Sequence, residues 1–159
     1  GRIIAFTRPQ GQKGGRGKIG YAYFDSLDSL NRQALEDAPI ITSHFIDEEW
    51  GGANEVHLLR NGLLGVLGHI AKREENGNLF YCAMTFAFDT EKNKSGKIKI
   101  IAEKRDFGET ESKRPDLVNV VFSGGIRRLS GGRAALYAGV SDAEAHLLII
   151  KDPFSEYEA

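Results

Sequence analysis

Short apolar segments alternate with turn residues along nearly the whole chain. This spacing is typical of β-strands, and we expect strands at about residues 2–7, 19–24, 39–43, 55–60, 63–71, 79–88, 97–103, 117–123, 133–140 and 145–151. Gly and Asn tolerate positive φ, so they mark the turns: Asn61-Gly62, Asn76-Gly77, Ser95-Gly96, Ser123-Gly124-Gly125 and Gly131-Gly132. The best helical signal, at residues 27–38, predicts a turn or a short helix. The pattern therefore predicts an all-β fold built as an antiparallel meander.

A repeated order of features divides the chain into units. Residues 1–8, 62–69 and 132–139 each begin with Gly and continue as an apolar strand. A polar loop and a second strand follow each copy, and that second strand ends at an Asp. The copies recur at a period near 60 residues, which is typical of large β-propeller blades with long loops. We therefore expect a β-propeller, of which this chain supplies about two and a half blades.

The ends of these copies predict a binding site. If each copy is the inner strand of a blade, the strand ends meet at one rim of the central channel. Arg8, His69 and Asp142 would then lie together, and convergent polar groups at a channel mouth favour a ligand site. An incomplete ring also leaves strand edges unpaired, so we expect missing sequence or a partner. The strand pattern at the first residues agrees with a chain that begins inside a fold, or with a trimmed N-terminus.

The composition is that of a globular domain. The 159 residues are 41% hydrophobic and 27% charged, which is too apolar for a disordered chain. A formal net charge of −1 gives no field that attracts nucleic acid or an anionic membrane. Cys82 is the only cysteine and lies in an apolar run, so we expect a buried thiol and no internal disulfide. With no secretory signal pattern, we expect a cytoplasmic protein.

A basic, glycine-rich loop at residues 11–18 carries Lys13, Arg16 and Lys18. It overlaps a G-x-G-x-x-G pattern at residues 15–20. A dinucleotide site is excluded, because that motif requires a helix after it and this chain continues as a strand. The loop is either a flexible hairpin connection or a binding site for phosphate or a nucleotide.

Four further segments carry candidate ligand contacts. Trp50 stands near Asn54 and Glu55, a grouping that suits stacking and hydrogen bonding to a sugar, although a core Trp is the alternative. His69 at a strand end is either structural or a ligand to phosphate or a sugar hydroxyl. Arg114 lies in a basic loop and is either solvated or an anion contact.

The fourth segment contains Asp142, Glu144 and His146, which share one face if the strand is regular. Such a face suits a metal, an acid–base group or contacts to sugar hydroxyls. No paired Cys/His motif accompanies it, so we predict hydrogen bonding to a sugar and no metal site.

Several longer stretches together resemble one known family. They are residues 6–10 (FTRPQ), 14–20 (GGRGKIG), 49–55 (EWGGANE), 65–71 (GVLGHIA), 114–117 (RPDL), 136–145 (LYAGVSDAEA) and 152–154 (DPF). Over nearly its whole length the chain is similar to the β-1,2-mannosyltransferase/phosphorylase family, long catalogued as a domain of unknown function. Its members are five-bladed β-propellers related to β-mannoside phosphorylases and furanosidase-type glycosidases.

The resemblance implies that residues 1–159 form the C-terminal portion of a single five-bladed propeller domain. In the related phosphorylases an Asp of the N-terminal half donates the proton, and no residue here matches it. We therefore assign no catalytic residue and expect the general acid in the missing half. The implied reaction is phosphorolysis of β-1,2-linked manno-oligosaccharides, or its reverse, with phosphate attacking the anomeric carbon. That chemistry needs neither a metal nor an organic cofactor.

The implied partners are a manno-oligosaccharide, inorganic phosphate or a sugar nucleotide, and the N-terminal half, with no nucleic acid and no membrane. The candidates for holding phosphate are Arg8, Arg16, Lys18, His69 and Arg114. The candidates for contacting the sugar are Trp50, Asn54, Glu55, Asp142 and Glu144. Two alternatives remain: a glycoside hydrolase of the same architecture, in which water replaces phosphate, and a non-catalytic sugar-binding propeller.

Overall fold

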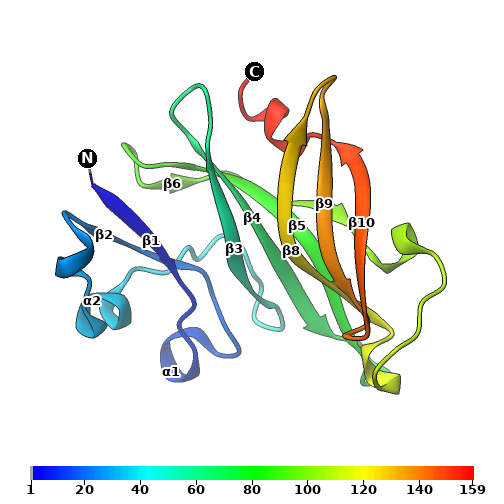
Figure 1. The fold of residues 1–159 in the computed structure, drawn as a ribbon. Coiled ribbons are helices and arrows are strands. Elements are labelled where there is room, and N and C mark those ends of the chain that lie inside the picture. The colour runs from blue at the N-terminus through cyan, green and yellow to red at the C-terminus, as the bar shows by residue number, and fades with distance from the viewer. Residues whose placement is uncertain (1) are drawn as a thin grey trace.

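The chain folds into two β-sheets with only short helices between the strands (Figure 1). The computed structural model describes residues 2–159. The small sheet is a hairpin of β1 (Ile3–Thr7) and β2 (Gly20–Phe24). The large sheet contains β3 (Trp50–Leu58), β4 (Leu64–Arg73), β5 (Leu79–Asp89), β6 (Lys94–Ser95), β7 (Lys99–Ala102), β8 (Asn119–Leu129), β9 (Arg133–Val140) and β10 (Glu144–Lys151). The helices are α1 (Gly11–Gly14), α2 (Arg32–Asp37) and the 3₁₀ helices η1 (Leu27–Ser29), η2 (Lys104–Phe107), η3 (Pro115–Leu117) and η4 (Pro153–Glu156).

The large sheet consists of two antiparallel units joined by a short parallel bridge. In the first unit β3, β4 and β5 pair in sequence order, and β6 and β7 pair with β5. In the second unit β8, β9 and β10 form a meander. The bridge pairs Phe80 with Asn119 and Tyr81 with Val120. The all-β class is as predicted, and this mixed arrangement is consistent with part of a propeller-like fold.

The first unit, β3 to β7, is the central one, and its strands have buried side chains on both faces. Neighbouring side chains on a strand point in opposite directions, so alternate residues face opposite sides. On one face Val66 packs with Phe86 in a cluster that includes Phe6 of the β1–β2 hairpin. On the other face Leu67 packs with Leu136 of β9. The central unit is therefore covered by the hairpin on one side and by β8, β9 and β10 on the other (Figure 1).

β3 and β8 carry a bulge at the same register position. Pairing of β3 with β4 shifts between Ala53 and Glu55, and pairing of β8 with β9 shifts between Ser123 and Gly125. A bulge inserts one extra residue that has no partner in the ladder and re-aims nearby side chains. The same irregularity in both units supports their derivation from one repeated motif.

The repeat copies at residues 62–69 and 132–139 fall on β4 and β9, which lie between two neighbouring strands. The prediction that these copies are the innermost strands was therefore wrong. The strands that precede them, β3 and β8, were predicted only in part, at 55–60 and 117–123, because their glycines resemble turn residues. In particular, Ser123-Gly124-Gly125, predicted as a turn, lies inside β8 at its bulge.

Two other predicted elements also differ from the structure. Residues 39–43 form no regular strand, and only Ile40 makes an isolated bridge, to Gly20. Residues 27–38 are not one helix but η1 followed by α2. The break arises because Asn31 accepts a hydrogen bond from the backbone N–H of Ala34 and so caps a new helix start.

Cys82 is buried, as predicted, and burial raises the pKa of its thiol to about 12. The thiol is therefore protonated near neutral pH and behaves as a small apolar group. Within residues 2–159, no helix is long and apolar enough to cross a membrane.

Candidate anion-binding site

A cavity of about 460 Å³ lies where the β1–β2 hairpin meets the two units of the large sheet. Its walls come from the end of β1, from β3, β4, β5 and β8, and from the β9–β10 turn. The lining residues are Arg8, Ala53, Asn54, His69, Leu79, Tyr81, Leu117, Val120, Phe122 and Asp142. The sequence repeat predicts that Arg8, His69 and Asp142 share one cavity, and the structure confirms that placement.

Arg8 is held in place by backbone groups and by glycines. Its Nε donates to the carbonyl of Gly51 at 2.9 Å, and Nη2 donates to the carbonyl of Arg16 at 3.2 Å. A Cβ on Gly17 would lie 2.7 Å from Arg8 Nε, and one on Gly52 would lie 3.0 Å from its Cδ. Gly17 of the basic loop and Gly52 of β3 thus leave room for the Arg8 side chain to pack closely. Its remaining N–H groups are available to a ligand.

His69 is 4% exposed and lies between two aromatic rings. The ring of Tyr81 stacks on it at a centroid distance of 5.9 Å, and the ring of Phe122 is tilted over it at 4.5 Å. Nδ1 lies 2.9 Å from Oδ1 of Asn54. Burial, followed by the charge of Arg8, lowers the pKa of His69 to about 4, so the ring is neutral at pH 7.

Tyr81 supplies a further donor that was missed from the sequence. Its hydroxyl oxygen accepts a hydrogen bond from Trp50 Nε1 at 3.0 Å. An indole N–H can only donate, so the hydroxyl hydrogen of Tyr81 remains free to donate to a ligand in the cavity. Tyr81 lies in the same apolar run as Cys82, so nothing in the sequence marked it as a ligand contact. Only the contact with Trp50 in the folded structure shows that the hydroxyl oxygen accepts a hydrogen bond and that its hydrogen is left to donate.

Trp50 does not offer the open stacking face predicted for a sugar. Its side chain is buried, with the residue only 3% exposed, and the guanidinium of Arg16 lies 3.9 Å from its ring centroid. The alternative prediction, a core Trp, describes its environment. The cause is the close packing of the basic loop over the start of β3, where Gly51 N donates to the carbonyl of Gly17 at 3.0 Å.

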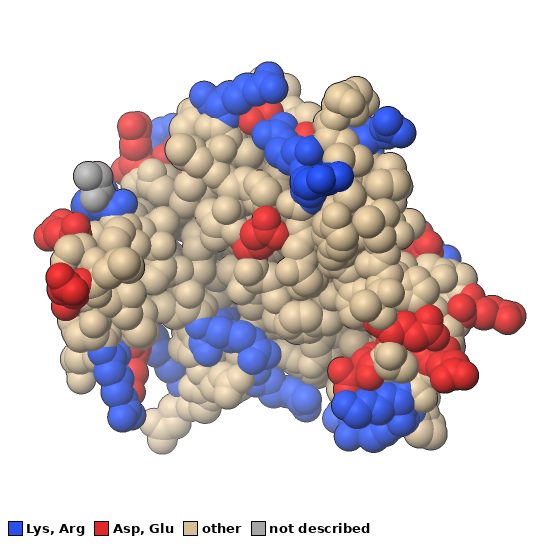
Figure 2. Space-filling view, viewed as in Figure 1, with Lys and Arg blue, Asp and Glu red and all other residues tan. Residues whose placement is uncertain are grey.

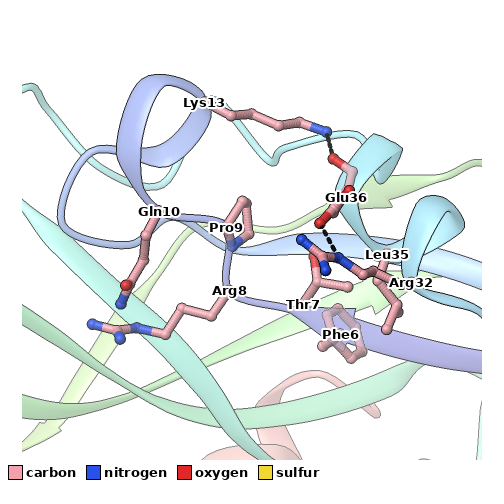
Figure 3. Close-up of a pocket in the computed structure, with 9 residues that line it drawn as sticks. All are labelled: Phe6, Thr7, Arg8, Pro9, Gln10, Lys13, Arg32, Leu35 and Glu36. Carbon is pink, nitrogen blue, oxygen red and sulfur yellow. Dashed lines mark hydrogen bonds and ion pairs between the residues drawn. The ribbon is translucent and has the colours of Figure 1, made fainter.

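The other cations of the basic loop bind the protein itself. Lys18 Nζ donates to the carbonyls of Ile46 and Glu49, both at 2.9 Å. Lys13 Nζ donates to the carbonyl of Glu36 on α2. This last contact closes one side of a second pocket of about 500 Å³, shown in Figure 3. In that view Arg8 points away from Lys13 and Glu36, so the two pockets share Arg8 without sharing the other cations.

Asp142 occupies the β9–β10 turn, where Ser141 and Asp142 both have positive φ. Its carboxylate accepts a hydrogen bond from Lys113 Nζ at 2.6 Å. That hydrogen bond, together with the charge of Lys113, holds the pKa of Asp142 below its ordinary value. Asp142 is therefore an ionised acceptor at the rim, suited to a sugar hydroxyl.

The remaining predicted site residues lie outside the cavity lining. Glu55 accepts from the backbone N–H of Ile126 at 2.8 Å, which links β3 to β8. Glu144 accepts from the backbone N–H of Glu111 and pairs with His146. Arg114 makes two hydrogen bonds to Asp116, both at 3.1 Å. Among residues 2–159, no cluster of His, Cys, Asp and Glu side chains has the form of a metal site.

These groups have the chemistry that suits a compact anion. Arg8 and Tyr81 present N–H and O–H donors, and His69 adds a neutral imidazole, from three different strands or strand ends. Donors that are fixed in position before a ligand arrives stabilise negative charge well. On the face shown in Figure 2, basic and acidic side chains form separate small groups on a mostly uncharged surface.

The chain is similar to proteins of one family and to solved enzymes. A family model described as a protein of unknown function (DUF1861) matches residues 1–156, and the curated proteins gave no match. A mannose phosphorylase from Leishmania mexicana, solved in complex with a phosphate ion, is 31% identical with a TM-score of 0.89. A hypothetical protein from Leishmania major is 30% identical with a TM-score of 0.86. A GDP-Man-dependent mannosyltransferase from Leishmania mexicana is 29% identical with a TM-score of 0.78.

These matches cover nearly all of this chain but only part of the other proteins. They cover 100%, 100% and 97% of this chain, and 50%, 50% and 53% of the respective matched chains. The chain therefore spans about half the length of the solved structures it matches.

Proposed function

The chain belongs to the DUF1861 family, and on that basis we propose that it is the phosphate-holding portion of a mannoside phosphorylase or mannosyltransferase. The observation that carries the proposal is the convergence of Arg8, His69 and Tyr81 on one cavity. The matched enzymes support the choice of ligand, since one is a phosphorylase solved with phosphate and another uses GDP-Man. In both ligands the group that the cavity would hold is a phosphate.

In this function a phosphate oxygen forms a bond to the anomeric carbon of a terminal mannosyl residue while the glycosidic C–O bond breaks. The departing oxygen takes a proton from an acid that this chain does not contribute, and the product is a sugar 1-phosphate. Arg8, with His69 and Tyr81, holds the phosphate against charge repulsion and orients it for attack. Asp142 accepts hydrogen bonds from sugar hydroxyls. The β-1,2 linkage is part of the proposal.

The proposed architecture is a five-bladed propeller completed by a second half. β4 has β3 beside it and β9 has β8 beside it, whereas β1 pairs only with β2. The repeat therefore implies that a strand equivalent to β3 and β8 belongs beside β1. The matched structures are about twice as long as this chain, which agrees with a half that provides this strand and the general acid.

The test is steady-state phosphorolysis by the full-length protein, with phosphate and a β-1,2-linked mannoside varied separately. Arg8→Ala should raise KM for phosphate by about tenfold or more, because a charge-assisted hydrogen bond contributes roughly 1.5–3 kcal/mol. KM for the neutral mannoside should change much less. Arg133→Ala is the matched control, since Arg133 is an exposed arginine at the start of β9.

An Arg8→Ala protein with unchanged KM for phosphate and unchanged turnover would place the phosphate elsewhere. Sugar release that is independent of both phosphate and sugar nucleotide would instead show a hydrolase of this architecture. Transfer from GDP-mannose without phosphorolysis would assign the mannosyltransferase class.

A further inference from the structure

Asn54 occupies an unusual backbone position beside the cavity. It lies at the β3 bulge, between the register positions of Ala53 and Glu55, and therefore has no partner in the ladder. The corresponding residue of the β8 bulge is Gly124, which has no side chain. Of these two equivalent positions, only the one facing the cavity thus carries a polar group. The bulge aims that group at His69.

The side-chain amide of Asn54 lies between two hydrogen-bonding groups. As placed in the structure, Asn54 Oδ1 is 2.9 Å from His69 Nδ1 and 3.5 Å from Ser123 Oγ. Ser123 is fully buried, and its Oγ is 2.8 Å from the carbonyl oxygen of Gly68. A carbonyl oxygen can only accept, so the single hydroxyl hydrogen of Ser123 points to Gly68. Ser123 therefore presents a lone pair, not a hydrogen, to Asn54.

This assignment of hydrogens decides which end of the amide faces inward. The oxygen and nitrogen ends of an Asn amide have nearly the same shape, so hydrogen bonding must distinguish them. An inward oxygen would meet the lone pair of Ser123 Oγ. An inward NH₂ group has two hydrogens, one directed at Ser123 Oγ and one at His69 Nδ1. The NH₂ orientation satisfies both neighbours.

We propose that Asn54 is a positioning residue that donates a hydrogen bond to His69 Nδ1 and keeps the only imidazole proton on Nε2. Nε2 makes no hydrogen bond within residues 2–159, and the residue lines the cavity, so Nε2 is the ring nitrogen left to meet a ligand. His69 then offers a neutral N–H donor to a phosphate oxygen. The inference rests on the proposed function of the cavity as a phosphate site.

The tautomer of His69 matters because the imidazole ring stays uncharged in the cavity. A neutral imidazole with its proton on Nδ1 would present the Nε2 lone pair to the phosphate, which repels it. The same ring with its proton on Nε2 donates a hydrogen bond. Burial of the ring, followed by the charge of Arg8, opposes protonation and lowers the pKa of His69, so the donor has to come from the choice of tautomer.

The first experiment reads the tautomer directly in the full-length protein labelled with ¹⁵N-histidine. Two-bond ¹⁵N–¹H correlation spectra at pH 7 distinguish protonated from unprotonated ring nitrogens, and His69→Gln assigns the signals. The wild type should show a protonated Nε2 and a bare Nδ1. Asn54→Asp should protonate Nδ1, because a carboxylate can only accept. A thermal melt of each variant confirms that it is folded.

The second experiment measures KM for phosphate in the same variants. Asn54→Asp should raise it by about tenfold while changing KM for the mannoside much less. A wild-type His69 with its proton on Nδ1, or Asn54→Asp with an unaltered spectrum, would overturn this inference and leave the phosphate site standing if Arg8→Ala still raises KM. Unchanged phosphate KM in both Asn54→Asp and Arg8→Ala would overturn the proposed function, and the role of Asn54 with it.

Discussion

At the scale of single residues, each of three polar side chains of the cavity is held in place by a hydrogen bond to a neighbouring group. The Nε of Arg8 is bound to the carbonyl of Gly51, and the hydroxyl oxygen of Tyr81 accepts from Trp50. His69 is held by Asn54 at Nδ1. Such anchoring leaves the free hydrogens in fixed positions before a ligand arrives, which reduces the reorganisation that binding requires.

The burial of His69 predicts a pH dependence of stability. Burial, followed by the charge of Arg8, lowers the pKa of His69 from 6.5 to about 4 in the folded protein. Between these values the unfolded chain binds more protons, so the free energy of unfolding should fall as the pH drops from 6.5 to 4. The contribution of this one group is up to about 3 kcal/mol. His69→Gln should remove it.

Urea unfolding of the full-length protein at several pH values in that range measures the effect. His146→Gln is the matched control, because His146 is half-buried on β10 and pairs with Glu144. If His69→Gln and the wild type lose stability equally on acidification, the ring is not held neutral by the fold.

At the scale of elements, β3 brings the basic loop and β4 together because its second and third residues, Gly51 and Gly52, have no side chains. A Cβ on Gly51 would lie 2.2 Å from the carbonyl oxygen of His69, so this part of the strand requires glycine. The bulge follows directly and turns Asn54 toward His69. One short segment thus fixes the position of Arg8 from one side and of His69 from the other.

Gly52→Ala tests this role of β3. The new Cβ would lie 3.0 Å from Arg8 Cδ and 3.1 Å from His69 Cε1, so it should displace the arginine side chain, which is the more flexible of the two. We expect KM for phosphate to rise by about tenfold, because the charge-assisted contact of Arg8 is weakened. Phosphorolysis kinetics with phosphate varied would measure this change.

Gly124→Ala is the control for that substitution. Gly124 lies at the bulge of β8, and a Cβ there would meet only the backbone of Tyr137, at 3.4 Å from its oxygen. KM for phosphate should therefore stay at the wild-type value in this variant. A Gly52→Ala protein that also keeps the wild-type KM would show that Arg8 tolerates the new methyl group or does not contact phosphate.

At the scale of the whole molecule, the sequence pattern was sufficient for the strand content and for the convergence of distant residues. Alternating apolar residues and glycine turns locate most strands, and the repeat brings Arg8 and His69 to one cavity. The sequence pattern was insufficient where contacts between distant segments determine the local structure or the role of a side chain. The bulges look like turns or loops in the sequence, and Tyr81 becomes a donor only through its contact with Trp50. Burial of Trp50 likewise depends on a loop distant in the sequence.

The outer face of β10 remains uncovered in the described residues. Its side chains alternate, so that Leu148 and Ile150 pack against the core while Leu147 and Ile149 are 53% and 48% exposed. β10 also ends the strand order of the large sheet, with β9 as its neighbour. An apolar strand at a free sheet edge is a hazard for aggregation unless another element covers it. In the proposed five-bladed ring, the second half of the protein covers it.

This covering predicts the effect of charge on β10. The double substitution Leu147→Asp and Ile149→Asp should lower the melting temperature of the full-length protein by several degrees, because two carboxylates would be buried without partners against the second half. Leu27→Asp is the matched control, since Leu27 is 72% exposed on η1, and it should leave the melting temperature nearly unchanged. Circular dichroism during thermal unfolding measures both variants. If the double variant melts at the wild-type temperature, the outer face of β10 stays in solvent in the complete protein, and the ring closes through a different surface.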